Sequence, residues 1–138
     1  MKKKFRIIAV VIIAILSVSG FGTFDAHADV VTKRGKISYY NPTKPGSDGK
    51  TMTESDCAVD KNYSYLPKGT AISAYNLDNG ASKVLEKWDY GDFEKYGVIL
   101  DVLPKTFKAL GGNVNNGYIK NAMIQWKEPF GFDEITEE

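Results

Sequence analysis

Residues 97–111 read "GVILDVLPKTFKALG", a pattern that predicts a strand followed directly by a helix. The branched apolar run "VILDVL" (98–103) is typical of a buried strand. One carboxylate, Asp101, interrupts this run, and a buried carboxylate costs free energy unless it is paired or used. Pro104 suits the first position of the helix, and the pair Gly111-Gly112 ends it. The stretch therefore predicts a strand-to-helix unit that carries one acidic side chain near the end of the strand.

Four other segments are rich in β-branched or aromatic residues and are bounded by turn residues, as strands are. They are residues 36–40, 70–77, 82–88 and 118–126. The sequence "LDNGA" (77–81) places an Asn-Gly pair between two of them, which predicts a tight hairpin with Gly80 at positive φ. A helical turn is expected in "ESDCAVD" (54–60). The whole pattern predicts a mostly β fold, closed or sandwich-like, with one or two short helices.

The first 28 residues have the features of a secretory signal peptide. A basic start precedes the apolar stretch "IIAVVIIAILSV" (7–18), and "AHA" (26–28) follows it. The alternative is a membrane anchor, but twelve apolar residues are too few to cross a bilayer comfortably. We expect cleavage before Asp29, which would leave residues 29–138 as one secreted, extracellular or cell-wall-associated domain. Its last residues, "DEITEE" (133–138), form a short acidic tail.

Removing the signal peptide limits the chemistry that remains. It takes away four of 18 basic and one of 17 acidic residues, so the 14 basic and 16 acidic residues left give a net charge of −2. No basic patch favours nucleic acid or a membrane surface. The only histidine, His27, is lost, which excludes Ser-His, Cys-His and histidine-based metal sites. We expect a monomer with no metal and no cofactor.

The single cysteine, Cys57, cannot form an internal disulfide. No histidine is left to activate its thiol, so we expect a small, buried and unreactive side chain.

Six short motifs follow one another in an informative order. They are "ISYYN" (37–41), "TMTE" (51–54), "LPKGT" (66–70), "NLDNG" (76–80), "WDYGDF" (88–93) and "GVILDVLPKTFKALG" (97–111). In this order they resemble the six-stranded double-psi β-barrel of rare lipoprotein A-like proteins and of the first domain of bacterial expansins. The resemblance covers most of residues 29–138 and implies one barrel domain with one or two short helices.

Known members of this class bind or cleave cell-wall glycans, peptidoglycan or cellulose, in a groove across the barrel. The resemblance implies two aspartates in that groove, and by motif position these are Asp89 and Asp101. Glu54 is the third carboxylate that the family pattern supports as a catalytic candidate. Asp101 also has a structural alternative, in which its carboxylate accepts N–H bonds at the helix start after Pro104. Both roles are open, and they are compatible with each other.

The sequence departs from the pattern of rare lipoprotein A-like lytic transglycosylases. Tyr63 stands where these enzymes carry a histidine, "WDYG" replaces their "NDRG", and the spacing from Asp89 to Asp101 is one residue longer. The expansin-like mode of action needs no histidine. Four aromatic residues either offer ring faces to sugars or fill the core: Tyr39, Tyr40, Trp88 and Tyr90.

Three functions are consistent with these features. The first is a secreted single-domain protein that binds cell-wall polysaccharide without hydrolysing it, as expansins do. The second is a peptidoglycan lytic transglycosylase, a lyase that needs one carboxyl group as acid and base. The third is binding to a protein, as a protease inhibitor or an antimicrobial effector. In that case the loop "NPTKPGSDGK" (41–50) inserts into the partner, whereas otherwise it is a solvated connector.

Overall fold

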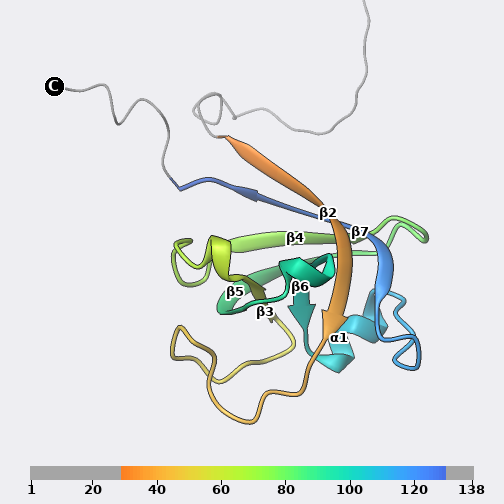
Figure 1. Ribbon diagram of the computed structural model, residues 1–138, viewed down its shortest axis with the longest axis horizontal. Coiled ribbons are helices and arrows are strands. Elements are labelled where there is room, and N and C mark those ends of the chain that lie inside the picture. Colours follow the sequence, from red (N-terminus) through yellow and green to blue (C-terminus); the bar gives the residue numbers. More distant parts are fainter. Residues whose placement is uncertain (1–28, 130–138) are drawn as a thin grey trace, which may run out of the picture. The chain divides into compact units, whose positions relative to one another are not determined.

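Within residues 29–129, the part of the chain that the computed structural model describes, six strands close into a barrel (Figure 1). Their spatial order is β2-β6-β3-β5-β4-β7. The same residues contain one α-helix and two 3-10 turns. The elements are β2 (Val30–Tyr39), β3 (Asp56–Asp60), η3 (Lys61–Tyr63), β4 (Ala71–Asn76), β5 (Ser82–Gly91), η4 (Glu94–Tyr96), β6 (Val98–Val102), α1 (Pro104–Ala109) and β7 (Ile119–Lys127).

Strand pairing interleaves distant parts of the chain. β2 runs parallel to β6 and antiparallel to β7, whereas β3 runs parallel to β5 and antiparallel to β6. β4 pairs antiparallel with β5 and with β7. Each strand therefore has two partners, which confirms the predicted mostly β, closed architecture. The proposed signal peptide and the acidic tail lie outside the described residues, and no helix within residues 29–129 is long and apolar enough to span a membrane.

The five predicted strands are confirmed, but the helical turn predicted at 54–60 is wrong. Residues 56–60 form β3, a strand that is buried along its whole length between β5 and β6. Its two terminal aspartates are buried because each carboxylate caps a neighbouring turn. Asp56 accepts a hydrogen bond from the backbone N–H of Thr53 (2.8 Å), and Asp60 accepts one from the N–H of Asn62 (3.0 Å).

Side chains from all six strands fill the interior, and α1 packs against it with its predicted apolar face. Phe107 and Leu110 are both buried, as the helical spacing indicated. The helix is tied to the turn before β3, because the Thr106 hydroxyl donates to the carbonyl oxygen of Glu54 at 2.7 Å. The other fully buried apolar side chains include Ile37, Cys57, Val59, Leu66, Ile72, Leu85, Leu100, Val102 and Ile124.

Gly35 allows β2 to pass close to β6. A Cβ atom at this position would lie 2.7 Å from Cγ2 of Ile99 and 2.8 Å from the carbonyl oxygen of Gly97. The register of β2 shifts next to this point, where the strand leaves β7 and begins to pair with β6. A residue without a side chain is therefore required where β2 changes partners.

The predicted hairpin joins β4 to β5 through a loop of residues 77–80. The N–H of Asn76 bonds the carbonyl oxygen of Ala81 (2.9 Å), and the N–H of Gly80 bonds the carbonyl oxygen of Asn76 (2.9 Å). Gly80 has a φ of +79°, which confirms the predicted conformation. Asn76 and Asn79 both donate to the carbonyl oxygen of Leu110, at 2.8 and 3.3 Å, so this hairpin also caps the end of α1.

Replacing Gly80 with valine is expected to lower the free energy of unfolding by about 1 kcal/mol or more, because β-branched residues resist positive φ. No atom lies within 4 Å of the Cβ position, so the loss would be conformational rather than steric. Gly80→Asn is the matched control, since asparagine tolerates this region. Thermal unfolding of both variants measures the difference. Equal melting temperatures for the wild type and the valine variant would contradict the prediction.

Cys57 is expected to resist thiol reagents in the native state. Its side chain is 0% exposed in β3, and burial raises the pKa of its thiol well above the ordinary value. Both effects suppress the thiolate, which is the reactive form. Labelling of the folded protein should therefore be much slower than labelling in denaturant. Equal rates in the two conditions would show that β3 opens readily.

Candidate functional site

Four residues on four neighbouring strands form one row across the barrel wall. Ser38 on β2 is opposite Asp101 on β6, and Ala58 on β3 is opposite both Asp101 and Asp89, the latter on β5. We call these four residues the acidic row. Neighbouring strands lie about 4.8 Å apart, so the Cα atoms of the two aspartates are separated by two spacings, about 10 Å. The structure thus brings together the two aspartates that the resemblance implied.

A bulge in β5 places Asp89 in this row. Cys57 is opposite Lys87, and the next residue of β3, Ala58, is opposite Asp89, so Trp88 is the extra residue on β5. A bulge redirects the side chains that follow it and is common beside functional sites.

Asp101 is partly buried and has a single hydrogen-bond donor among the described residues. The Ser38 hydroxyl donates to Oδ1 of Asp101 at 2.8 Å. Burial raises the pKa of the Asp101 carboxyl to about 6, the Ser38 hydrogen bond opposes this rise, and the negative charge of Asp89 adds to it. The helix-start alternative has no support here, because the residue before α1 is Leu103 and the structure has no side-chain cap there.

Asp89 lies in a different environment. Its Oδ1 accepts hydrogen bonds from the N–H groups of Ser47 (2.8 Å) and Tyr90 (2.9 Å), and its Oδ2 accepts one from the Tyr40 hydroxyl (2.9 Å). Burial alone would raise the pKa of Asp89, but these hydrogen bonds outweigh it and hold the pKa below the ordinary value. Asp89 is therefore an ionised anchor that fastens the loop of residues 41–50 to the barrel.

Tyr40 connects the two aspartates electrostatically. Burial and the hydrogen bond to Asp89 raise the pKa of its hydroxyl, with smaller contributions from the charges of Asp89 and Asp101, so the group stays a proton donor. Beside it lies a cleft of about 240 Å³, which we call the loop cleft. Its lining residues are Tyr40, Asn41, Pro42, Thr43, Lys44, Pro45, Ser47 and Asp89.

The other three predicted aromatic residues lie in different places. The Tyr39 ring packs against Phe107 with a centroid distance of 4.8 Å, and its hydroxyl donates to the carbonyl oxygen of Val114 at 3.0 Å, so this side chain belongs to the core. Tyr90 is 39% exposed and follows Asp89 in the chain, and the ammonium of Lys87 lies 5.5 Å from its ring centroid. Trp88 is partly exposed, and its indole N–H donates to Glu86 at 2.9 Å.

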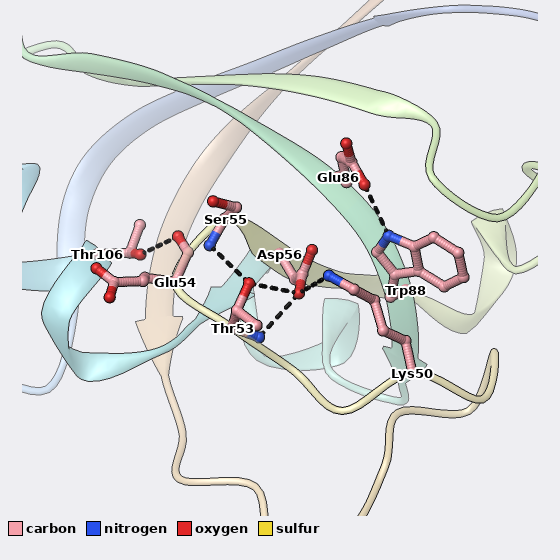
Figure 2. A network of polar contacts seen from close by, with 8 residues as sticks. All are labelled: Lys50, Thr53, Glu54, Ser55, Asp56, Glu86, Trp88 and Thr106. Atoms are coloured by element: carbon pink, nitrogen blue, oxygen red, sulfur yellow. Dashed lines mark hydrogen bonds and ion pairs between the residues drawn. The ribbon is translucent and has the colours of Figure 1, made fainter.

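The third predicted carboxylate, Glu54, lies in another network (Figure 2). Its side chain is about half exposed and pairs with Lys105 at 3.4 Å. Figure 2 shows the neighbouring contacts, in which the ammonium of Lys50 lies between the buried Asp56 and the ring of Trp88. Among the described residues, the hydrogen bonds and the ion pair of Glu54 are made with Lys105 and Thr106 and not with residues of the acidic row.

Two residues that position this site were missed from the sequence. Ser38 supplies the hydrogen bond to Asp101, and Lys87 holds the loop of residues 41–50 through an ion pair with Asp48. Lys87 is 1% exposed, and its ammonium lies 2.8 Å from Oδ2 of Asp48, 2.8 Å from the carbonyl oxygen of Leu66 and 3.1 Å from that of Ser64. The one signal in the sequence for a buried Lys87 was its spacing from Leu85. Residues two apart on a strand point to the same face, and Leu85 is buried.

The strand order and the two parallel strand pairs define a class of protein, the double-psi β-barrel. Streptomyces papain inhibitor matches with a TM-score of 0.55 at 16% identity, covering 70% of this chain and 94% of the inhibitor. Clavibacter michiganensis expansin matches with a TM-score of 0.54 at 21% identity, covering 73% of this chain. A mutant of that expansin in complex with cellohexaose matches with a TM-score of 0.52 at 18% identity. The chain spans about half, 53%, of the expansin's length.

The chain belongs to the family of the uncharacterized protein YdjM of Bacillus subtilis (strain 168). The two are 31% identical over 115 residues, which cover 83% of this chain and 93% of YdjM. No protein-family model matches the chain.

Proposed function

We propose that this protein acts outside the cell and binds a cell-wall polysaccharide, either peptidoglycan or a cellulose-like glycan, at the acidic row and the loop cleft. We propose that it binds this polysaccharide without hydrolysing it. The observation that carries the proposal is the contrast between its two aspartates. Asp89 has three hydrogen-bond donors, whereas Asp101 has one, from Ser38. Asp101 is thus the carboxyl group with hydrogen-bonding capacity left for a ligand.

The surroundings suit a saccharide. A carboxyl group with a pKa of about 6 is protonated in mildly acidic solution, so it can donate to a glycosidic or ring oxygen and also accept from a hydroxyl. Tyr90 offers a partly exposed ring beside Asp89, and sugars pack their apolar faces on such rings. The likeness to an expansin solved with cellohexaose supports this choice of ligand class.

Hydrolysis has less support than binding. Glycoside hydrolysis ordinarily needs two carboxyl groups, one as acid and one as base or nucleophile. Asp89 is ionised, but both of its oxygens are used to hold Tyr40 and the loop of residues 41–50. Only Asp101 is available in the row, and one carboxyl group is sufficient for binding.

One observation favours a second candidate function, peptidoglycan lytic cleavage. This reaction needs a single carboxyl group as acid and then base, because the sugar itself supplies the attacking oxygen. A partly buried Asp101 with a raised pKa has the properties of a general acid. Analysis of soluble fragments from purified walls distinguishes the two functions, since anhydro-sugar products require cleavage.

The test compares Asp101→Asn with the wild type in pull-downs of residues 29–138 on purified peptidoglycan and on cellulose. Asparagine keeps the shape of the side chain but cannot ionise, and its amide N–H is a weaker donor than a carboxylic acid O–H. Replacing the strong hydrogen bond by this weaker one, at a cost of about 1.5 kcal/mol, should weaken binding by roughly 10-fold. Asp92→Asn is the matched control, because Asp92 is half exposed and pairs only with Lys61 and Lys95 among the described residues.

Wild-type binding should also depend on pH. If protonated Asp101 is the donor, binding is strongest below pH 6 and weakens as the pH rises through about 6. The variant should lack this dependence. Unchanged binding of Asp101→Asn at every pH would reject the proposal, and inhibition of a papain-like protease without any polysaccharide binding would favour the protein-partner function instead.

A further inference from the structure

A second cleft, of about 390 Å³, lies away from the acidic row. Three segments form it: the β4–β5 hairpin, the chain after α1 and the start of β7. We call it the amide cleft, because four of its lining residues are asparagines, three of which are exposed. The lining residues are Asn76, Asp78, Asn79, Gly111, Gly112, Asn113, Asn116, Tyr118, Ile119 and Lys120, and none of them belongs to the acidic row or the loop cleft.

Part of the wall of this cleft is held by internal hydrogen bonds. Asn76 is only 5% exposed, donates to the carbonyl oxygen of Leu110 at 2.8 Å and accepts from the N–H of Asp78 at 3.0 Å. Asn121 donates to Oδ1 of Asp78 at 2.9 Å. Because these groups are bonded to one another, the wall is formed before any ligand binds, which lowers the entropic cost of binding.

Three other lining residues have polar groups that are not used in this way. Within residues 29–129, the side-chain amide of Asn116, the Tyr118 hydroxyl and the Lys120 ammonium form no hydrogen bond or ion pair. The Tyr118 side chain is 37% exposed, and the ammonium of Lys36 lies 4.5 Å from its ring centroid. Donors, acceptors and an aromatic ring therefore line one cleft.

The charges of the cleft select the class of ligand. Asp78 and Lys120 are the two charged residues that line the cleft, and their charges balance each other, while the further positive charge of Lys36 lies over the Tyr118 ring. An anionic phosphate would need an excess of positive charge, and an amine would need an excess of negative charge. Amides both donate and accept, as sugar hydroxyls do, and a tyrosine ring suits the apolar face of a sugar. The volume lies within the ~300–1,000 Å³ range of small-ligand sites.

We propose that the amide cleft is a second binding site, specific for a neutral saccharide and separate from the acidic row. This site does not depend on the function proposed above, because it shares no residue with it. A protein with two separate saccharide sites can bind two chains of a polysaccharide, or two places on one chain, at the same time, which raises the apparent affinity for a polymer over that for a short oligosaccharide.

The test is titration of the isotope-labelled protein with cellohexaose and with chitohexaose, followed through backbone and side-chain amide resonances. We expect saturable shifts in residues 76–79 and 111–120, and these shifts should persist in Asp101→Asn. Asn116→Ala should weaken this binding by about 3- to 10-fold, the equivalent of one net hydrogen bond. Asn115→Ala is the matched control, since it lies in the same exposed loop but does not line the cleft.

Three results would overturn the proposal. The first is the absence of saturable shifts in the cleft with either oligosaccharide. The second is equal affinity in Asn116→Ala, Tyr118→Ala and the wild type. The third is binding of inorganic phosphate at the cleft in preference to both sugars. If Asp101→Asn abolishes the response at the acidic row but leaves the cleft shifts unchanged, the two sites are independent.

Discussion

Replacing Lys87 with methionine is expected to lower the free energy of unfolding by about 3–5 kcal/mol, the usual cost of removing one partner from a buried ion pair. Methionine has a similar length, so packing is largely kept. Three groups lose their partner: the carboxylate of Asp48 and the carbonyl oxygens of Ser64 and Leu66. This loss is a large fraction of the stability of a domain of this size.

Urea unfolding followed by tryptophan fluorescence measures this effect. Lys83→Met is the matched control, because Lys83 lies on the same strand and forms no ion pair among the described residues. Adding Asp48→Asn to Lys87→Met should recover part of the loss, since it removes the uncompensated charge. A cost below about 1 kcal/mol for Lys87→Met would mean that Asp48 keeps its solvation when Lys87 is removed.

The second large effect concerns Asp101 and stability. Its pKa of about 6 in the folded protein exceeds the ordinary value of 3.8, so the folded state holds the proton more tightly than the unfolded state. The contribution of Asp101 to stability therefore falls as the pH rises from about 4 to about 6, and stays low above that. One pKa unit is worth about 1.4 kcal/mol, so ionised Asp101 costs the fold on the order of 2–3 kcal/mol.

Asp101→Asn should therefore be as stable as the wild type near pH 4 and more stable above pH 7. The amide oxygen of asparagine can still accept from Ser38, so the packing of the row is kept. Melting temperatures of both proteins from pH 4 to pH 8 give the comparison, and their difference isolates Asp101 from other titrating groups. A variant that is less stable at pH 8 would assign Asp101 a structural role and would direct the search for the binding site elsewhere.

The strands and the helix could be predicted largely because their signals are local. Apolar runs bounded by turn residues gave five strands, and Pro104 with Gly111 gave the limits of α1. β3 was missed because it has only three apolar residues between two aspartates, a pattern that rarely indicates a buried strand. Asp60 can be buried because the N–H groups of Phe93 and Glu94, distant in sequence, donate to it, and a sequence does not display those partners. Asp56 is paired nearer by, with Thr53 and Lys50.

The site could be predicted only in part. Asp89 and Asp101 were located through the resemblance, and the structure places them in one row. The roles of the consecutive residues Tyr39 and Tyr40 could not be distinguished in the sequence. Side chains alternate in direction along extended backbone, so Tyr39 packs in the core and Tyr40 bonds Asp89. Glu54 was grouped with the aspartates, but the turn before β3 directs it toward Lys105.

The interleaved strand order also determines when this protein can fold. Residue Val30 of the first strand pairs with Lys127 of the last, and the other neighbour of β2 begins at Val98. During synthesis β2 therefore cannot pair until most of the chain has been made, and contacts of such long range form slowly. A product that ends before β7 would leave β2 and β4 as unpaired edges, open to pairing with other chains. Premature termination should therefore yield aggregates rather than a smaller folded domain.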